Sequence, residues 1–349
     1  MSTPVRWSED LETEQPDEAA ETEQTIQTMA HTMAQGFEVH RHGTSATHAK
    51  SHGVVTGTLT VLPGLRPEVA QGLFADPATY DVVLRLASEP GVIDDDREKR
   101  ARGAALKVLD VPGEKLREGW TSQDFLFNTW PVLPQGDVHT YLQAIRQRDE
   151  HFGQTNRVRL GTMLHHPRNV ETLFDKTPNI SPVSHTYYSQ SAFRHGDHVA
   201  KLALRPTSAE QLALRDTEVG KDDEPSVLRD WTRDYFATRE ARFELGVQLC
   251  TDLDTMPIED VSVEWPEDQS PYLAVAELIF APQECFSPAR RVFAEDVMSW
   301  RPWYGLAAHR PLGSINRLRR TAYERLGGIR HEVNDREERD PRTLADVPD

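Results

Sequence analysis

A series of short runs rich in β-branched and aromatic residues, separated by Gly, Pro and Asp, limits what this chain can fold into. Runs of this length, bounded by turn residues, are typical of strands in an antiparallel sheet or barrel. We therefore expect an α+β protein built on an antiparallel β-barrel with surrounding α-helices. The expected strands cover residues 54–61, 80–86, 104–109, 125–127, 184–189, 199–204, 242–249 and 272–279.

Helical patterns alternate with these runs. From Thr25 onward, apolar residues recur at helical spacing as far as Phe37, which predicts an amphipathic helix. Further helices are expected over 137–146, 168–174, 227–241 and about 314–326, the last one after the break at 311–313. Residues 1–23 are acidic and poor in apolar side chains, a composition that predicts a disordered tail. We expect residues 24–349 to form a single domain.

Charge and composition exclude several classes of partner. The 349 residues carry a formal net charge of −17, which would be repelled by nucleic acid and by anionic membranes. The sequence has no run of roughly 18 apolar residues, and its acidic N-terminus does not resemble a signal peptide. Two cysteines, Cys250 and Cys285, are too few for a disulfide framework. We expect a cytoplasmic protein.

Arg319 and Tyr323 are the most informative pair of residues for function. An arginine one turn before a tyrosine lies on the same helix face, and its positive charge favours the phenolate. A phenolate is a competent ligand for haem iron. His48, far upstream, could supply acid–base chemistry on the other side of such a group.

Several motifs in the same order along the chain resemble the catalase family. Segment 47–50, Thr-His-Ala-Lys, is similar to the one that carries the distal histidine, and Arg85 in 83–86 is similar to a haem-propionate ligand. Asn128 stands three residues before a proline, as in the family. The remaining matches are 101–107, 184–187, 258–266, 272–282 and the spacing of Arg319, Tyr323 and Arg330.

The resemblance implies a barrel that encloses haem b and a role for each matched residue. Tyr323 would bind the iron, and Arg319 would tune it, while Arg85 and Arg330 would neutralise the propionates. His48 would move a proton between the peroxide oxygens. Asn128 would orient the peroxide, and Thr47 would bond His48 or the peroxide, so that both would be catalytic residues beside His48. The chain stops soon after the last match, so it is similar to small family members that commonly form homodimers.

Three positions depart from the family pattern. Ser45 stands where larger catalases have a propionate-binding arginine, for which Arg41 or His42 could substitute. Ala87 stands where a small residue usually accepts a hydrogen bond from the distal histidine, with Ser88 adjacent. Thr47 replaces an aliphatic residue, an arrangement that resembles allene oxide synthases and the small catalase-like peroxidases.

The function implied by the resemblance is a haem peroxidase of the small catalase-like type. It would cleave hydrogen peroxide or an organic hydroperoxide and oxidise a small organic donor, with weak catalase activity. Two alternatives stay open. One is a haem enzyme that isomerises a fatty-acid hydroperoxide or oxidises a biosynthetic substrate, and the other is a non-catalytic haem-binding sensor or carrier. The pairs His40/His42 and His165/His166 lack the further ligands of a recognised zinc site.

Overall fold

The protein is described here by a computed structural model, which covers residues 3–154 and 177–349. Eight antiparallel strands close into a barrel in the order β5-β4-β3-β2-β1-β9-β8-β7, with β7 pairing back to β5. The ninth strand, β6, pairs with β7 outside this ring. The strands are β1 (Lys50–Val61), β2 (Thr79–Ser88), β3 (Arg102–Val108), β4 (Gln123–Asn128), β5 (Tyr187–Tyr188), β6 (Phe193–His195), β7 (His198–Pro206), β8 (Ala241–Leu249) and β9 (Leu273–Phe280).

The barrel confirms the predicted antiparallel sheet and differs from it in detail. The expected strand over 184–189 is reduced to β5, because 182–184 forms a turn of 3-10 helix before it. β6 has no counterpart among the expected strands. β1 and β9 approach so closely that a side chain at Gly57 would lie 2.3 Å from the Ile279 carbonyl oxygen, so only glycine fits there.

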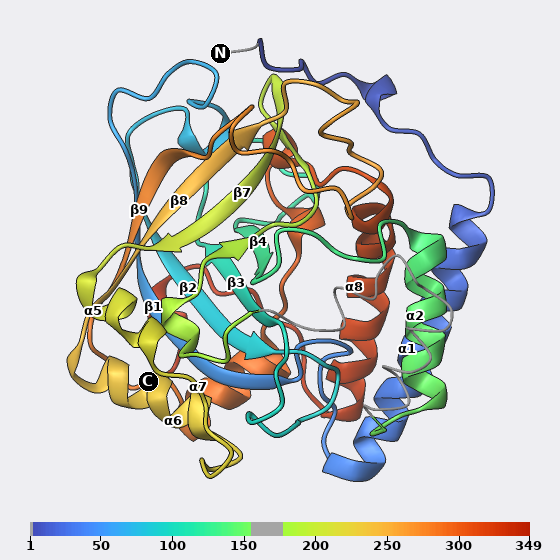
Figure 1. Ribbon diagram of the computed structural model, residues 1–349, viewed down its shortest axis with the longest axis vertical. Coiled ribbons are helices and arrows are strands. Elements are labelled where there is room, and N and C mark those ends of the chain that lie inside the picture. Colours follow the sequence, from blue (N-terminus) through green and yellow to red (C-terminus); the bar gives the residue numbers. More distant parts are fainter. Residues whose placement is uncertain (1–2, 155–176) are drawn as a thin grey trace.

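Three long helices form a layer beside the barrel (Figure 1). α1 (Glu18–His40) and α2 (Val138–Glu150) pack against each other and against α8 (Ser314–Val333). Their buried faces share an apolar cluster that includes Ile26, Ile145 and Leu318. Shorter helices are α5 (Ala209–Ala213), α6 (Val227–Thr238), which contacts β1, and α7 (Pro288–Val292). The helix expected over 168–174 lies outside the described residues.

The acidic N-terminal segment differs from its prediction, because residues 3–23 are placed against the rest of the chain. α1 already begins at Glu18, and Val5 and Trp7 pack on an apolar cluster that contains Trp265. Arg317 of α8 pairs with Glu12 at 2.9 Å and with Glu18 at 2.6 Å. Composition predicts disorder when carboxylates stay solvated, whereas here arginine neutralises them.

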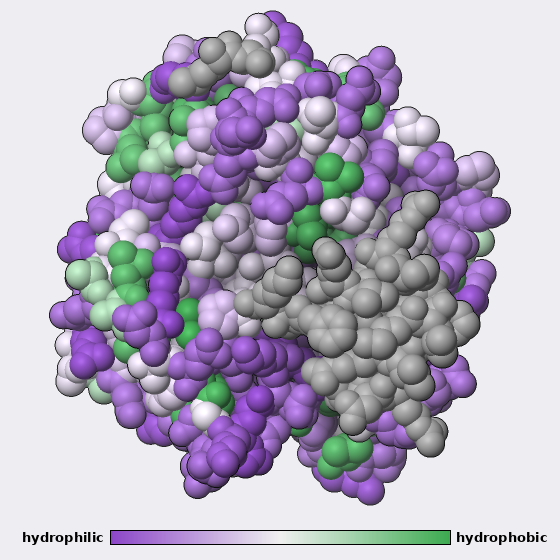
Figure 2. Space-filling view, viewed as in Figure 1, coloured by the Kyte–Doolittle hydropathy of each residue, from purple (hydrophilic) through white to green (hydrophobic). Residues whose placement is uncertain are grey.

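The interior of the barrel is filled by side chains that alternate along the strands. Leu84, Leu106, Phe125, Leu245 and Leu278 are fully buried in this core. The face of the molecule in Figure 2 is mostly hydrophilic, with apolar side chains in small separate groups. No helix in the two described stretches is both long enough and apolar enough to cross a membrane.

Candidate active site

A cavity of about 240 Å³ lies between the barrel and the helix layer. Strands β2, β3 and β4 line one side of it, and helices α1, α2 and α8 line another, together with the segment before β1 and the loops at 130–135, 189–190 and 299–300. Much of the lining is apolar, with Met29, Leu133 and Leu318 among its side chains. All seven predicted site residues line this cavity: Thr47, His48, Arg85, Asn128, Arg319, Tyr323 and Arg330.

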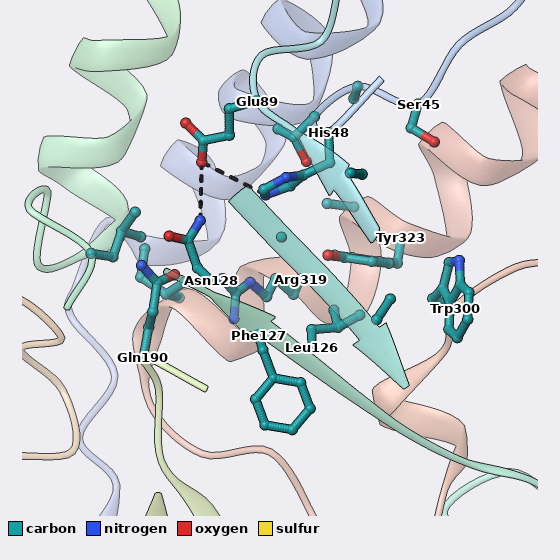
Figure 3. A pocket seen from close by; sticks show the side chains of 18 of the residues that line it. Ser45, His48, Glu89, Leu126, Phe127, Asn128, Gln190, Trp300, Arg319 and Tyr323 are labelled. Atoms are coloured by element: carbon teal, nitrogen blue, oxygen red, sulfur yellow. Dashed lines mark hydrogen bonds and ion pairs between the residues drawn. The ribbon is translucent and has the colours of Figure 1, made fainter. Parts of the chain in front are cut away.

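Helix α8 presents Arg319, Tyr323 and Arg330 to the cavity because positions four and seven residues apart share one helix face. The helix starts after Gly313, whose φ of 85° is in the left-handed region. Its first turn is fixed by carboxylates, since the Gly313 and Ser314 amides donate to Glu12 and Glu259. These contacts set the position from which Tyr323 projects into the cavity (Figure 3).

The Tyr323 hydroxyl makes no hydrogen bond to the residues that the structure describes. Burial raises the pKa of Tyr323, while the positive charges of Arg319 and Arg85 oppose that shift. The sequence correctly predicts that Arg319 lowers the pKa of Tyr323. Burial raises this pKa by more than Arg319 lowers it. Arg319 donates to the Asn316 amide oxygen at 3.2 Å and to the Ser191 hydroxyl at 3.5 Å. Since none of the described carboxylates pairs with Arg319, its charge acts on the cavity.

His48 is held in an unusual backbone conformation at the cavity wall, with φ at 53°. Its carbonyl oxygen accepts a hydrogen bond from Arg85 at 2.9 Å. The imidazole lies against Gly103, where a side chain would come within 2.6 Å of Nδ1. Burial lowers the pKa of His48 to about 4, opposed by Glu89. The ring is therefore neutral at pH 7, the form in which one nitrogen can accept a proton.

Nδ1 of His48 is buried without a hydrogen-bond partner among the described residues. Ala87 lines the cavity but offers no side-chain acceptor. The neighbouring Ser88 hydroxyl bonds instead to His52 and Arg102. Neither Ala87 nor Ser88 therefore accepts a hydrogen bond from His48 that would fix its tautomer.

Asn128 ends β4 with its side chain held in one orientation. Its amide oxygen accepts a hydrogen bond from the Trp130 backbone at 2.9 Å, so the NH₂ group turns into the cavity. That NH₂ group lies 3.5 Å from a carboxylate oxygen of Glu89. The side chain thereby stabilises the turn before Pro131 and also faces the space beside His48.

The partner of Arg85 differs from the expectation. Its guanidinium forms two hydrogen bonds to Glu295, at 2.7 and 2.8 Å, so a protein carboxylate already neutralises this buried cation. Arg330 donates through Nη2 to Met298 and Ser299, while its Nε is buried with no partner among the described residues. Burial lowers the pKa of Arg330. Of the two arginines, Arg330 has the unpaired donor.

Ser45 and Thr47 line the cavity, and the residues suggested to replace the family arginine at position 45 do not. Arg41 pairs with Glu38 at the surface, and His42 pairs with Asp296 at 2.8 Å. Neither side chain is available to the cavity, so that part of the prediction is wrong. The Thr47 hydroxyl makes no hydrogen bond to a described residue.

Sequence reasoning missed Glu89, which lies beside His48 and Asn128 (Figure 3). Arg85, Ala87 and Glu89 alternate along and just beyond β2, so period-two counting from Arg85 would have found it. Tyr141 and Trp300 also line the cavity. The aromatic run at 300–304 could line a pocket by sequence, although its pattern favours core or dimer packing, and the structure places Trp300 at the cavity. His165 and His166 lie outside the described residues.

The donor set fits a haem. A tyrosine hydroxyl without a partner is a suitable ligand for ferric iron, and the orphaned Nε of Arg330 matches a propionate. Apolar side chains from three helices would cover a porphyrin. A neutral histidine and an amide NH₂ group then remain for a small oxygen-containing ligand.

Comparisons with known proteins show the fold. No family model matches the chain, and no curated protein matches it. The solved structures that are similar to it include catalase A from Saccharomyces cerevisiae (TM-score 0.66, 14% identity), a fungal catalase (0.63, 16%) and a bacterial catalase (0.60, 14%). The alignments cover 86%, 86% and 85% of this chain and 65%, 63% and 59% of theirs. The chain therefore has the catalase fold and spans less than two thirds of each neighbour.

Proposed function

We propose that this protein is a haem-dependent peroxidase of the small catalase-like type. It would cleave hydrogen peroxide or an organic hydroperoxide heterolytically and oxidise a small organic donor, with weak catalase activity. The observation that carries the proposal is the convergence of His48, Asn128 and Tyr323 in one cavity. These residues come from three separate segments, and a barrel without a bound group has no need for all three there.

Each residue has a role that its environment supports. Haem b, when bound, supplies an iron centre that exchanges electrons with a peroxide and then with a donor. Tyr323 would bind the iron through its phenolic oxygen, and Arg319 would favour the ionised form of that oxygen. Arg330 would bind a propionate. Arg85, already paired with Glu295, would fix the His48 carbonyl and add positive charge on the same side.

His48 would transfer the proton, and Asn128 would orient the peroxide. His48 is neutral at pH 7, so an imidazole nitrogen would accept the proton of one peroxide oxygen and return it to the other. Water or an alcohol would then leave. The Asn128 NH₂ group would donate to a peroxide oxygen and orient it. Thr47 is a second polar group next to His48 for the same ligand.

Two alternative functions would use all or some of these residues. The first is isomerisation of a fatty-acid hydroperoxide or oxidation of a biosynthetic substrate, which Thr47 beside His48 also fits. The second is a haem-binding sensor or carrier, which needs Tyr323 but neither His48 nor Asn128. We further propose that the protein is a cytoplasmic homodimer. It would bind neither nucleic acid nor membrane.

A turnover assay separates these functions. Hydrogen peroxide with a phenolic donor should give donor oxidation in the haem-loaded protein, because His48 can move the peroxide proton. His48→Ala should lower that rate at least a hundredfold, since general acid–base groups typically contribute 10²–10⁴. His31→Ala, at an exposed histidine on α1, should keep the rate.

Rapid consumption of a fatty-acid hydroperoxide without any reductant, together with no donor oxidation, would replace the peroxidase by the isomerase. No consumption of any peroxide by a protein that binds haem would favour the carrier.

A further inference from the structure

Glu89 has the position of a ligand-binding group, and its contacts with the described side chains around it are long. Its Oε1 lies 3.7 Å from His48 Nε2 and 3.5 Å from Asn128 Nδ2, and Arg148 lies 3.9 Å from its other oxygen. All three distances are at or beyond the usual limit of a hydrogen bond. By comparison, Arg85 and Glu295 pair at 2.7 Å in the same cavity wall.

The backbone keeps Glu89 beside His48. The Ala49 amide donates to the Pro90 carbonyl oxygen at 2.9 Å, which joins the residues that follow His48 and Glu89. The Glu89 amide donates to Ala101 at the edge of β3. The segment after Glu89 also packs closely on the segment before His48, since a side chain at Gly91 would lie 2.2 Å from the Ala46 carbonyl oxygen. The carboxylate is therefore part of a fixed wall.

The charge of Glu89 opposes an anion at this point, whereas the charges of Arg85, Arg148 and Arg319 act on the neighbouring His48 in the opposite direction. Glu89 is 23% exposed, and its surface faces the cavity that His48 and Asn128 also line. At an effective dielectric constant of about 20, a unit charge at 4–5 Å still interacts by several kcal/mol. A ligand that carries a hydroxyl hydrogen can donate to Glu89 while it accepts from Asn128. A fluoride or azide ion has no hydrogen to donate and meets the carboxylate charge directly.

We propose that Glu89 makes this side of the cavity selective for neutral ligands that carry a proton, with its carboxylate accepting a hydrogen bond from the hydroperoxide O–H when the ligand binds, before His48 takes that proton. The inference rests on the proposed function and adds a residue to it. The part of the substrate that binds beside Glu89 would be a neutral hydroperoxide group. Arg148, at 3.9 Å from Glu89, reduces the repulsion of anions without removing it.

The test measures anion binding by the haem-loaded ferric protein, not turnover. Fluoride and azide are titrated at pH 7 and constant ionic strength, and the dissociation constants are read from the change in the visible spectrum. Glu89→Gln, which keeps the shape and removes the charge, should bind both anions at least tenfold more tightly than the wild type. Glu89→Asp should stay within threefold of the wild type. Arg148→Gln should bind both anions at least threefold more weakly.

Two controls isolate the charge in the cavity. Nitric oxide is neutral, so its affinity should change less than threefold in Glu89→Gln. Glu210→Gln removes an exposed glutamate on α5 and should leave fluoride binding unchanged.

Unchanged anion affinity in Glu89→Gln, with a normal haem spectrum, would overturn this inference and leave the proposed function standing. If Glu89→Gln does not fold, an unchanged affinity in Arg148→Gln would overturn it in the same way. Failure of the wild-type protein to bind haem would overturn the proposed function and this inference with it.

Discussion

Gly103 and Arg85 decide where the His48 side chain lies. Gly103 leaves room for the imidazole, and Arg85 holds the carbonyl of a residue whose φ is positive. Both come from strands more than 35 residues away in the sequence. A histidine motif alone therefore predicts the residue but not its environment, and the environment gives it a pKa of about 4.

Buried histidines make the stability of the protein depend on pH. Burial lowers the pKa of His48 to about 4, of His185 to about 3 and of His195 to about 4. In the unfolded chain their pKa is about 6.5, so between about pH 6.5 and 4 the unfolded state binds more protons. The free energy of unfolding is then highest above pH 6.5 and falls as the pH decreases.

Each such histidine contributes about 1.4 kcal/mol per pH unit in this window. Asp124, whose pKa burial raises to about 6, acts in the opposite direction and cancels about one of them. Burial also lowers the pKa values of His52 and His309, which add to the effect. Urea unfolding of the haem-free protein should thus show a loss of at least about 3 kcal/mol between pH 6 and pH 5. His195→Gln should reduce that slope by about 1.4 kcal/mol per unit, whereas the exposed His31→Gln should not. A stability that is flat from pH 7 to 5 would refute this account.

At the scale of elements, α8 and the N-terminal segment depend on each other. Arg317 contacts Glu12, Glu18 and Glu259, and its side chain is only 13% exposed. Glu12 and Glu18 lie near the N-terminus and Glu259 lies more than 240 positions away, and Glu12 and Glu259 also accept hydrogen bonds from the amides at the start of α8. The position of Tyr323 thereby depends on residues that composition assigns to a disordered tail.

Arg317→Gln tests this dependence. The substitution leaves three neighbouring carboxylates without their cation, so we expect it to lower the free energy of unfolding by about 3 kcal/mol. Limited proteolysis should then cut before α1. Arg325→Gln is the matched control on the same helix, because its pair with Glu23 is exposed and contributes little. Equal stability of the two variants, with no new cleavage, would show that the N-terminal segment only lies on the surface.

The longer elements follow from local patterns in the sequence, and the short ones do not. β1, β2 and β8 are continuous runs of strand-forming residues, and the end of β4 at Asn128 coincides with the Pro131 signal. β5 has two residues and closes the barrel only because β4 and β7 lie on either side of it. No local pattern contains that information.

The candidate site likewise combines residues that a local pattern predicts with residues that only the fold brings together. The helix face with Arg319 and Tyr323 could be predicted because its spacing is local. Glu295, the partner of Arg85, could not, because the two are 210 positions apart and meet only through the packing of the segment after α7 against β2.

At the scale of the whole molecule, the barrel and the helix layer leave their cavity where the functional residues meet. The barrel contributes Arg85 and Asn128 together with the adjoining His48 and Glu89, and α8 contributes Tyr323 from the other layer. The fold is shared with catalases of known structure, and Ser45, Thr47 and Glu89 also line the cavity of this chain. We propose on these grounds that the cavity holds haem through Tyr323.

An optical spectrum of the purified protein from haem-replete cells tests that claim most directly. The wild type should show a Soret band with high-spin ferric features, because a phenolate ligand favours the ferric state. Tyr323→Phe should lose those features, while Tyr141→Phe, at the second tyrosine of the cavity, should retain them. A colourless wild-type protein, or a Tyr323→Phe variant with an unchanged spectrum, would contradict the account.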